Sequence, residues 1–161
     1  MMRKKKCYFE STPGVPEPIV YRVKRRLRFS EVDALAIAWH GNYPRFFEEA
    51  HSELMKKIGL TYFDYHRAKL AAPIAQWHAD YFSPLLLEEE FTVQATLHWN
   101  DGARLNVEYA LFHEDGSLVA TGYTVQMFYN VDVREPLILI PDIYEECRRK
   151  WRNGEFRGEF H

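Results

Sequence analysis

The sequence predicts an α+β fold in which a curved antiparallel sheet wraps around one long helix. Two observations carry this prediction. A single strongly amphipathic segment lies in the first half of the chain, and several segments of alternating polarity follow it. One apolar helix stripe packed on the apolar face of a sheet is a stable layered arrangement. The length of 161 residues fits a single domain.

The long helix is predicted over residues 43–58. Its apolar side chains recur at the i, i+3, i+4, i+7 spacing of one helix face. Asn42 is expected to cap the start, and Pro44 fits the first turn because its missing N–H would lack a partner there anyway. Gly59 fits the C-terminal cap. The stripe consists of Tyr43, Phe46, Phe47, Ala50, Leu54 and Ile58.

Strands are predicted where the period changes to two. Residues 19–29 alternate between a basic face and an apolar face, which Arg25 interrupts. The basic face holds Arg22, Lys24, Arg26 and Arg28, and the apolar face holds Tyr21, Val23, Leu27 and Phe29. Further strands are expected at 74–82, 91–99, 105–111 and 118–129, with Asp101-Gly102 and Asp115-Gly116 as turn signals.

Two shorter helices complete the prediction. One is expected over residues 61–69, where Thr61 and Asp64 have the spacing of a capping pair. The other follows Pro141 and covers residues 142–152. The domain organisation that we expect is a flexible leader at 1–18, which is basic and then rich in proline, one domain at 19–145, and a helix end and tail at 146–161.

The composition excludes several classes of function. A net charge of −2 gives no case for nucleic acid binding, and no apolar run reaches the roughly 20 residues that span a bilayer. Nothing in the placement of Cys7 and Cys147 demands a disulfide, so a reduced, cytoplasmic protein is expected. The seven histidines lack metal-ligand spacing, so no metal site is predicted.

The segment from Phe29 to Tyr43, FSEVDALAIAWHGNY, is the candidate reaction centre. Asp33 heads an apolar stretch, and a carboxylate beside apolar side chains is costly unless it is paired, hydrogen-bonded or used. The stretch ends at His40 and Gly41, just before the long helix, where backbone N–H groups lack partners and a partial positive charge develops. This combination suggests an acid or nucleophile facing an oxyanion-stabilising helix start. Asp33 as a simple loop cap is the alternative reading.

These residues resemble the hotdog fold, and more closely the 4-hydroxybenzoyl-CoA thioesterase-like family, including its branch associated with the bacterial Tol-Pal system. The first matching segment runs from Phe29 to Glu48, with an acid, an apolar loop, a histidine and an aromatic helix start. Supporting matches are Ile58-Gly59-Leu60, Asp80 to Pro84 and Thr124 to Tyr129. The family usually has glycine three positions after the acid, where this chain has Ala36, so the loop path is expected to differ.

The resemblance implies hydrolysis of an acyl-CoA thioester to free acid and CoA. Asp33 matches the family's catalytic carboxylate, as nucleophile or general base, and the backbone around His40 and Gly41 matches its oxyanion hole. Tyr43, Trp39 and Ala36 are the expected substrate-binding residues. No cofactor is implied, because CoA is part of the substrate.

The resemblance also implies a homodimer or a tetramer made of two dimers, with sites at the dimer interface. Acyl carrier protein in place of CoA, and a non-catalytic hotdog module that binds acyl groups or a protein partner, remain alternatives. Family members of a second type carry their acid on the long helix. Glu48, Glu49 and Glu53 lie off the apolar stripe or at its edge, so they are expected to be solvated instead.

Overall fold

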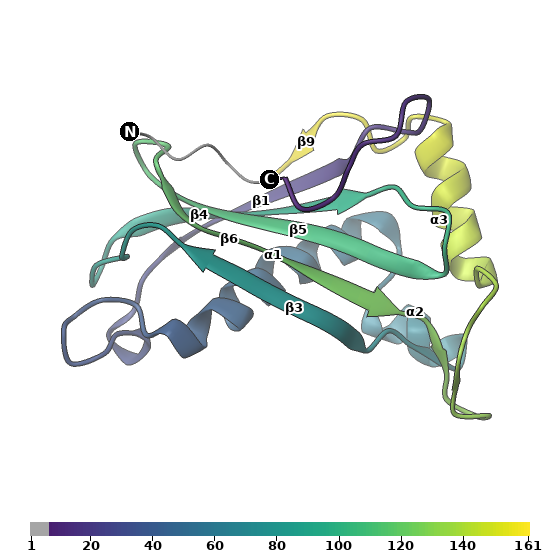
Figure 1. Ribbon diagram of the computed structural model, residues 1–161, viewed down its shortest axis with the longest axis horizontal. Coiled ribbons are helices and arrows are strands. Elements are labelled where there is room, and N and C mark those ends of the chain that lie inside the picture. The colour runs from purple at the N-terminus through teal and green to yellow at the C-terminus, as the bar shows by residue number, and fades with distance from the viewer. Residues whose placement is uncertain (1–6) are drawn as a thin grey trace.

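The computed structural model describes residues 7–161 and confirms the predicted α+β architecture (Figure 1). The strands of its main sheet are β1 Ile19–Arg26, β3 Ile74–Tyr81, β4 Glu90–His98, β5 Arg104–His113, β6 Leu118–Met127 and β9 Glu159–Phe160. Their order across the sheet is β3-β6-β5-β4-β1-β9. Neighbours are antiparallel except β1 and β9, which are parallel.

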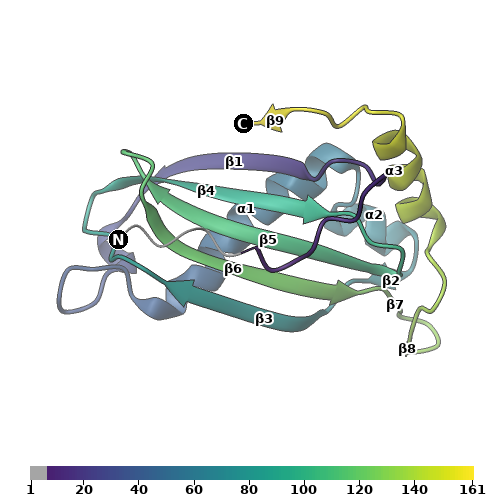
Figure 2. The ribbon, with the colours of Figure 1, turned by 45° about the horizontal axis from the view of Figure 1, so that its top comes forward.

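The long helix, α1 (Tyr43–Ile58), crosses one face of this sheet and packs on β4 and β1 (Figure 2). All six residues of the predicted stripe are buried. Gly59 ends the helix with φ +77°, as expected for a left-handed cap. Asn42 occupies the predicted N-cap position, but its side chain makes no capping hydrogen bond. Its backbone is already helical, and its side-chain amide donates to the carbonyl oxygen of Glu31 at 2.8 Å instead.

The core lies between α1 and the sheet, and aromatic contacts set its spacing. Phe47 stacks on Tyr109 of β5 with 4.5 Å between ring centroids. A Cβ at Gly122 of β6 would lie 2.6 Å from the Phe47 ring and 2.3 Å from the carbonyl oxygen of His78. Only glycine therefore allows α1 and β3 to approach β6 this closely.

The first strand is shorter than predicted. It ends at Arg26, and Phe29 begins a short 3₁₀ helix, η1 (Phe29–Glu31). Phe29 is 82% exposed, so its expected place on the apolar face is wrong. The cause is local: the backbone N–H of Arg28 donates to the carboxylate of Glu31 at 2.9 Å, which turns the chain out of the sheet.

The remaining elements lie beyond the end of the main sheet. They are α2 (Tyr62–Arg67), α3 (Asp142–Arg152) and a small sheet of β2 (Leu70–Ala71), β7 (Tyr129–Asn130) and β8 (Glu135–Pro136). The capping pair that starts α2 is confirmed, since the N–H of Thr61 donates to Asp64 at 2.8 Å. The bounds predicted for α3 are also confirmed. Strands of two residues have no readable period, and the small sheet was therefore not predicted.

Both ends of the described chain are fastened to the sheet. Tyr8 donates its hydroxyl to Asp80 at 2.6 Å and is bonded to Thr121 at 2.7 Å. The N-terminal segment before β1 crosses the face of the sheet opposite α1 (Figure 2). Part of the predicted leader thus holds defined contacts, while its first six residues lie outside the described chain. In the tail, Glu159 of β9 forms an ion pair with Arg22 of β1 at 2.6 Å.

Candidate active site

The predicted site lies on the loop between β1 and α1, which folds back on itself. Val32 and Ala38 form an antiparallel bridge, and the N–H of Asp33 donates to the carbonyl oxygen of Ile37 at 2.9 Å. The N–H of Trp39 donates to the carbonyl oxygen of Glu31 at 2.9 Å. This closed loop holds Asp33 and the start of the next 3₁₀ helix, η2 (His40–Asn42), on one small unit.

Asp33 is half-buried within this loop. Its Oδ1 accepts the N–H of Leu35 at 2.8 Å, the bond that a loop-capping aspartate makes. Over residues 7–161 this is the only hydrogen bond given to its carboxylate, and Oδ2 takes part in none. Asp33 can therefore cap the loop through Oδ1 and still use Oδ2 in a reaction.

Ala36 adopts the left-handed conformation that the family's glycine would favour. Its φ is +58°, and its carbonyl oxygen accepts the N–H of Leu87 at 3.1 Å. A residue with a side chain occupies this region at a cost of about 1–2 kcal/mol. Ala36 thus takes the positive φ that is costly for alanine, and a bond from the facing loop helps to hold it there.

The predicted oxyanion site falls at the start of η2. The N–H groups of His40 and Gly41 stand at the first positions of a helical turn, where the helix itself supplies no acceptor. The Trp39 ring covers this backbone so closely that a Cβ on Gly41 would lie 2.3 Å from it. His40 is exposed with its ring centroid 5.3 Å from that of Trp39, and the described chain gives its imidazole no bond to Asp33.

The other two predicted binding residues, Tyr43 and Trp39, differ in burial. Tyr43 is buried at the start of α1, with its ring edge-on to Tyr81 at 4.8 Å. Burial, followed by the proximity of Tyr81 and Glu89, raises the pKa of Tyr43 to about 12. Trp39 is half exposed, beside the candidate oxyanion site.

Two further tryptophans differ in exposure and in packing. Trp77 lies on β3, 41% exposed, with 6.0 Å between its ring centroid and that of Phe47. Trp99 packs against Trp151 of α3 at 5.1 Å and belongs to the core beneath that helix.

An ion-pair cluster beneath the loop was not predicted. Arg25, which interrupts the apolar face of β1, binds Glu31 at 2.5 Å and Glu49 at 2.6 Å. Its guanidinium carbon lies 4.7 Å from the ring centroid of Phe46. The cluster joins β1, η1 and α1, and Glu31 in turn holds Trp39 and Asn42 through its carbonyl oxygen. A lone arginine on an apolar face was the signal that could have revealed it.

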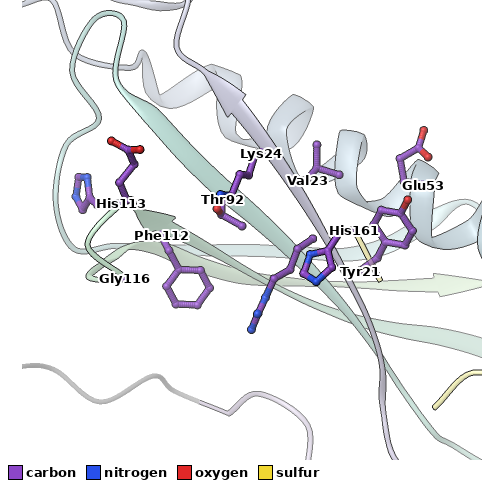
Figure 3. Close-up of a pocket in the computed structure, with 11 residues that line it drawn as sticks. Tyr21, Val23, Lys24, Glu53, Thr92, Phe112, His113, Gly116 and His161 are labelled. Carbon is purple, nitrogen blue, oxygen red and sulfur yellow. The ribbon is translucent and has the colours of Figure 1, made fainter. Parts of the chain in front are cut away.

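A cavity of about 960 Å³ lies beside β1, apart from the Asp33 loop. Figure 3 shows His113 and Phe112 at one end of it and Tyr21 and His161 at the other. Its described lining contains none of the predicted site residues. Two arginines on the basic face of β1 form ion pairs, since Arg22 binds Glu159 and Arg26 binds Glu90. The lining comprises Tyr21, Arg22, Val23, Lys24, Glu53, Thr92, Phe112, His113, Glu114, Gly116 and His161.

Of the helix glutamates, Glu48 and Glu49 are exposed and Glu53 is half-buried. Glu49 forms an ion pair with Arg25, and Glu53 lines the cavity beside β1. Residues 7–161 contain no group of three or more His, Cys, Asp or Glu side chains arranged to hold a metal ion. In the same range, no helix combines the length and apolar character that a bilayer crossing requires.

Comparison with known proteins extends these observations to the whole domain. A 1,4-dihydroxy-2-naphthoyl-CoA hydrolase of Thermosynechococcus vestitus is 25% identical over 120 residues, which cover 74% of this chain and 82% of that protein. The structure of a DHNA-CoA thioesterase from Staphylococcus aureus superposes with a TM-score of 0.73 at 24% identity, covering 89% of this chain and 99% of that one. A second S. aureus protein, solved in complex with CoA, gives a TM-score of 0.74 at 20% identity, covering 89% of both chains.

The two structural superpositions confirm the hotdog fold. The thioesterase-like superfamily matches residues 27–148, which include the closed loop, α1 and most of the sheet. The predicted enzyme class, a thioester hydrolase, agrees with this match. The chain therefore belongs to the thioesterase-like superfamily of hotdog proteins.

Proposed function

We propose that this protein hydrolyses an acyl-CoA to the free acid and CoA on the closed loop between β1 and α1. The observation that carries the proposal is the joint placement of Asp33 and the η2 start. Both are held by the same loop, through the Asp33–Ile37 and Trp39–Glu31 backbone bonds. A carboxylate and two backbone donors are the groups that acyl transfer needs.

In the proposed reaction the thioester carbonyl oxygen accepts hydrogen bonds from the N–H groups of His40 and Gly41. Asp33 then acts in one of two ways. It attacks the carbonyl carbon itself, giving an acyl-enzyme anhydride that water hydrolyses, or it takes a proton from a water that attacks. In both routes the carbon–sulfur bond breaks, CoA leaves as its thiolate, and that thiolate is then protonated. The reaction as proposed uses neither a metal nor a separate cofactor.

Trp39, Tyr43 and Ala36 are proposed to contact the acyl group. Trp39 packs against Gly41 at the start of η2, Tyr43 directly follows η2, and Ala36 lies in the Asp33 loop. The names of relatives point to aromatic acyl groups as the first to test. Chain length, CoA against acyl carrier protein, and membership of the Tol-Pal-associated branch stay predictions, as does a cytoplasmic location.

A homodimer is proposed as the active form, with the tetramer as its possible extension. The strand β3 is at the edge of the main sheet, bonded to β6 on one side within the described chain. Ile74, Trp77 and Tyr81 on this strand are 57%, 41% and 47% exposed. An edge strand with exposed large apolar side chains readily pairs with a second chain.

The test is thiol release from a panel of acyl-CoAs, from short and long aliphatic to hydroxylated aromatic, by the unaltered protein and by Asp33→Asn. The amide oxygen of asparagine can still accept the N–H of Leu35, so the loop is expected to keep its shape. Removing the carboxylate should lower kcat by about 10²- to 10⁴-fold. Asp142→Asn, an exposed residue of α3, serves as the control and should leave kcat unchanged.

Equal activity of Asp33→Asn and the unaltered protein would contradict the assignment of the acid. If the unaltered protein is folded and hydrolyses nothing in the panel, acyl carrier protein thioesters are the next substrates. Binding of acyl-CoA without turnover would favour the non-catalytic module.

A further inference from the structure

A second polar cluster lies at the far end of the segment that faces the Asp33 loop. This segment, residues 82–89, joins β3 to β4. The Nε2 of His113 lies 2.6 Å from the hydroxyl of Ser83, and its Nδ1 is hydrogen-bonded to the carboxylate of Glu89. All three residues are half-buried. None of them belongs to the site proposed above.

The order serine, histidine, carboxylate is that of a nucleophilic triad, but the hydrogen bonds differ from one. The Ser83 hydroxyl has a single proton, and the carbonyl oxygen of Leu118 at 3.0 Å is a second acceptor for it besides His113. The backbone N–H of Ser83 donates to Val119 at 3.2 Å and is not available to an oxyanion. The cluster therefore fastens the segment to the turn between β5 and β6.

Glu89 continues the connection toward the proposed site. While one of its carboxylate oxygens binds His113, the other accepts the backbone N–H of Leu86 at 2.8 Å. Leu86 forms an antiparallel bridge with Ile37, and the carbonyl oxygen of Ile37 accepts the N–H of Asp33 at 2.9 Å. An unbroken series of bonded groups thus runs from the β5–β6 turn to Asp33.

The two facing segments are both strained where they meet. Ala36 has φ +58° and Glu88 has φ +64°, and residues with side chains rarely adopt such values. The N–H of Leu87 donates to Ala36 at 3.1 Å, and the N–H of Glu88 donates to Leu27 at 3.0 Å. Such conformations persist only where surrounding bonds hold them, and they concentrate at functional sites.

We infer that Glu89 and His113 are positioning residues, which hold the 85–87 segment against the Asp33 loop and thereby set the place of the Asp33 carboxylate. This inference rests on the proposed function. Neither side chain touches the reacting atoms. Their effect is on geometry, and a displacement of about 1 Å in a catalytic group can cost up to about 10²-fold in rate.

The variants Glu89→Ala, Glu89→Gln and His113→Ala test the inference, with the acyl-CoA that the unaltered protein hydrolyses fastest. Glu89→Ala should lower kcat by about 10-fold or more and leave KM within about 2-fold, since the bound substrate contacts neither residue. Glu89→Gln should recover most of the loss, because its amide oxygen can accept the Leu86 N–H and its NH₂ can bond to His113. Glu90→Ala, which removes only an exposed ion pair with Arg26, is the matched control.

A measurement that does not depend on activity is hydrogen exchange at backbone amides. In Glu89→Ala, the amides of residues 33–38 and 85–87 should exchange faster, while those of α1 keep the protection seen in the control. If Glu89→Ala folds poorly, His113→Ala is the substitute variant. The same amides should then exchange faster, by a smaller factor. The double variant Glu89→Ala/His113→Ala should lose no more kcat or amide protection than Glu89→Ala alone, because both residues act through one connection.

The outcomes separate this inference from the proposed function. If Asp33→Asn is inactive but Glu89→Ala keeps kcat, or if exchange at residues 33–38 is unchanged, the positioning role is wrong. If Asp33→Asn is fully active, the proposed acid is wrong whatever Glu89 does. Ser83→Ala should change kcat by only a few fold. A loss as large as that of Asp33→Asn would instead identify Ser83 as a nucleophile and overturn the inference.

Discussion

At the residue scale, the candidate site depends on the smallest side chains as much as on Asp33. Gly41 has no side chain, and the Trp39 ring fills the space where one would be. The backbone N–H groups that would bind the oxyanion are thus covered on one side by an indole ring. A glycine here is required by contact with a neighbour, since its φ is not among the left-handed ones.

Gly41→Ala should therefore lower kcat/KM by about 10-fold or more, because the new Cβ displaces either the ring or the start of η2. The check is a double-mutant cycle with Trp39→Ala, measured by thiol release. In the Trp39→Ala background, adding Gly41→Ala should have little further effect. An equal loss in both backgrounds would show that contact with the ring is not the cause.

At the element scale, α1 meets the sheet through a polar contact as well as an apolar one. The Nδ1 of His51 is bonded to the hydroxyl of Tyr109 at 2.8 Å, and that hydroxyl is bonded to Thr124 at 3.0 Å. The loss of hydration at this position lowers the pKa of His51 to about 4. The helix–sheet interface therefore favours a neutral histidine.

This contact predicts a dependence of stability on pH. A histidine in the unfolded chain has a pKa near 6.5, so below that pH the unfolded state binds a proton that the folded state does not take up until about pH 4. The free energy of unfolding should fall as the pH drops from about 6.5 to 4, by about 2–3 kcal/mol from this residue. Urea unfolding at several pH values checks it. His51→Asn should lack this component, while the exposed control His66→Asn should retain it.

At the scale of the whole molecule, the two edges of the main sheet differ in how they are covered. At one end, β9 and the Arg22–Glu159 ion pair protect part of β1. At the other end, β3 carries exposed apolar side chains along an edge. The face opposite α1 is crossed by residues 7–18, which leaves the β3 edge as the apolar surface that best suits a second copy (Figure 2).

Trp77→Arg should convert the proposed dimer to a monomer and abolish hydrolysis, because a charge at the centre of the edge opposes pairing. Light scattering after gel filtration should give about twice the 19.2 kDa mass of one chain for the unaltered protein and about that mass for the variant. Ile138→Arg, at a 93% exposed position between β8 and α3, is the control. A monomeric but active unaltered protein would contradict the dimer.

Much of the fold was predictable because the relevant signals are local. The stripe of α1, its cap at Gly59, the alternating strands and the bounds of α3 all follow from periods and caps that a few neighbouring residues define. The errors occurred where a contact distant along the chain or an unexpected turn intervened. Phe29 left the sheet because Glu31 turned the chain, and Asn42 gave up its capping role to bind Glu31.

The sequence by itself determined the family, the long helix and the candidate acid Asp33, because each of these depends on residues close together in the chain. Only the tertiary structure decided which other polar residues support that acid. Glu89 and His113 lie more than 50 residues beyond Asp33. The bond between Glu89 and Leu86 is local, but Glu89 meets His113 only when β4 pairs with β5, and this cluster is linked to Asp33 only when Leu86 pairs with Ile37. Side-chain hydrogen bonds act over about 3 Å in space and carry no signature of spacing along the chain.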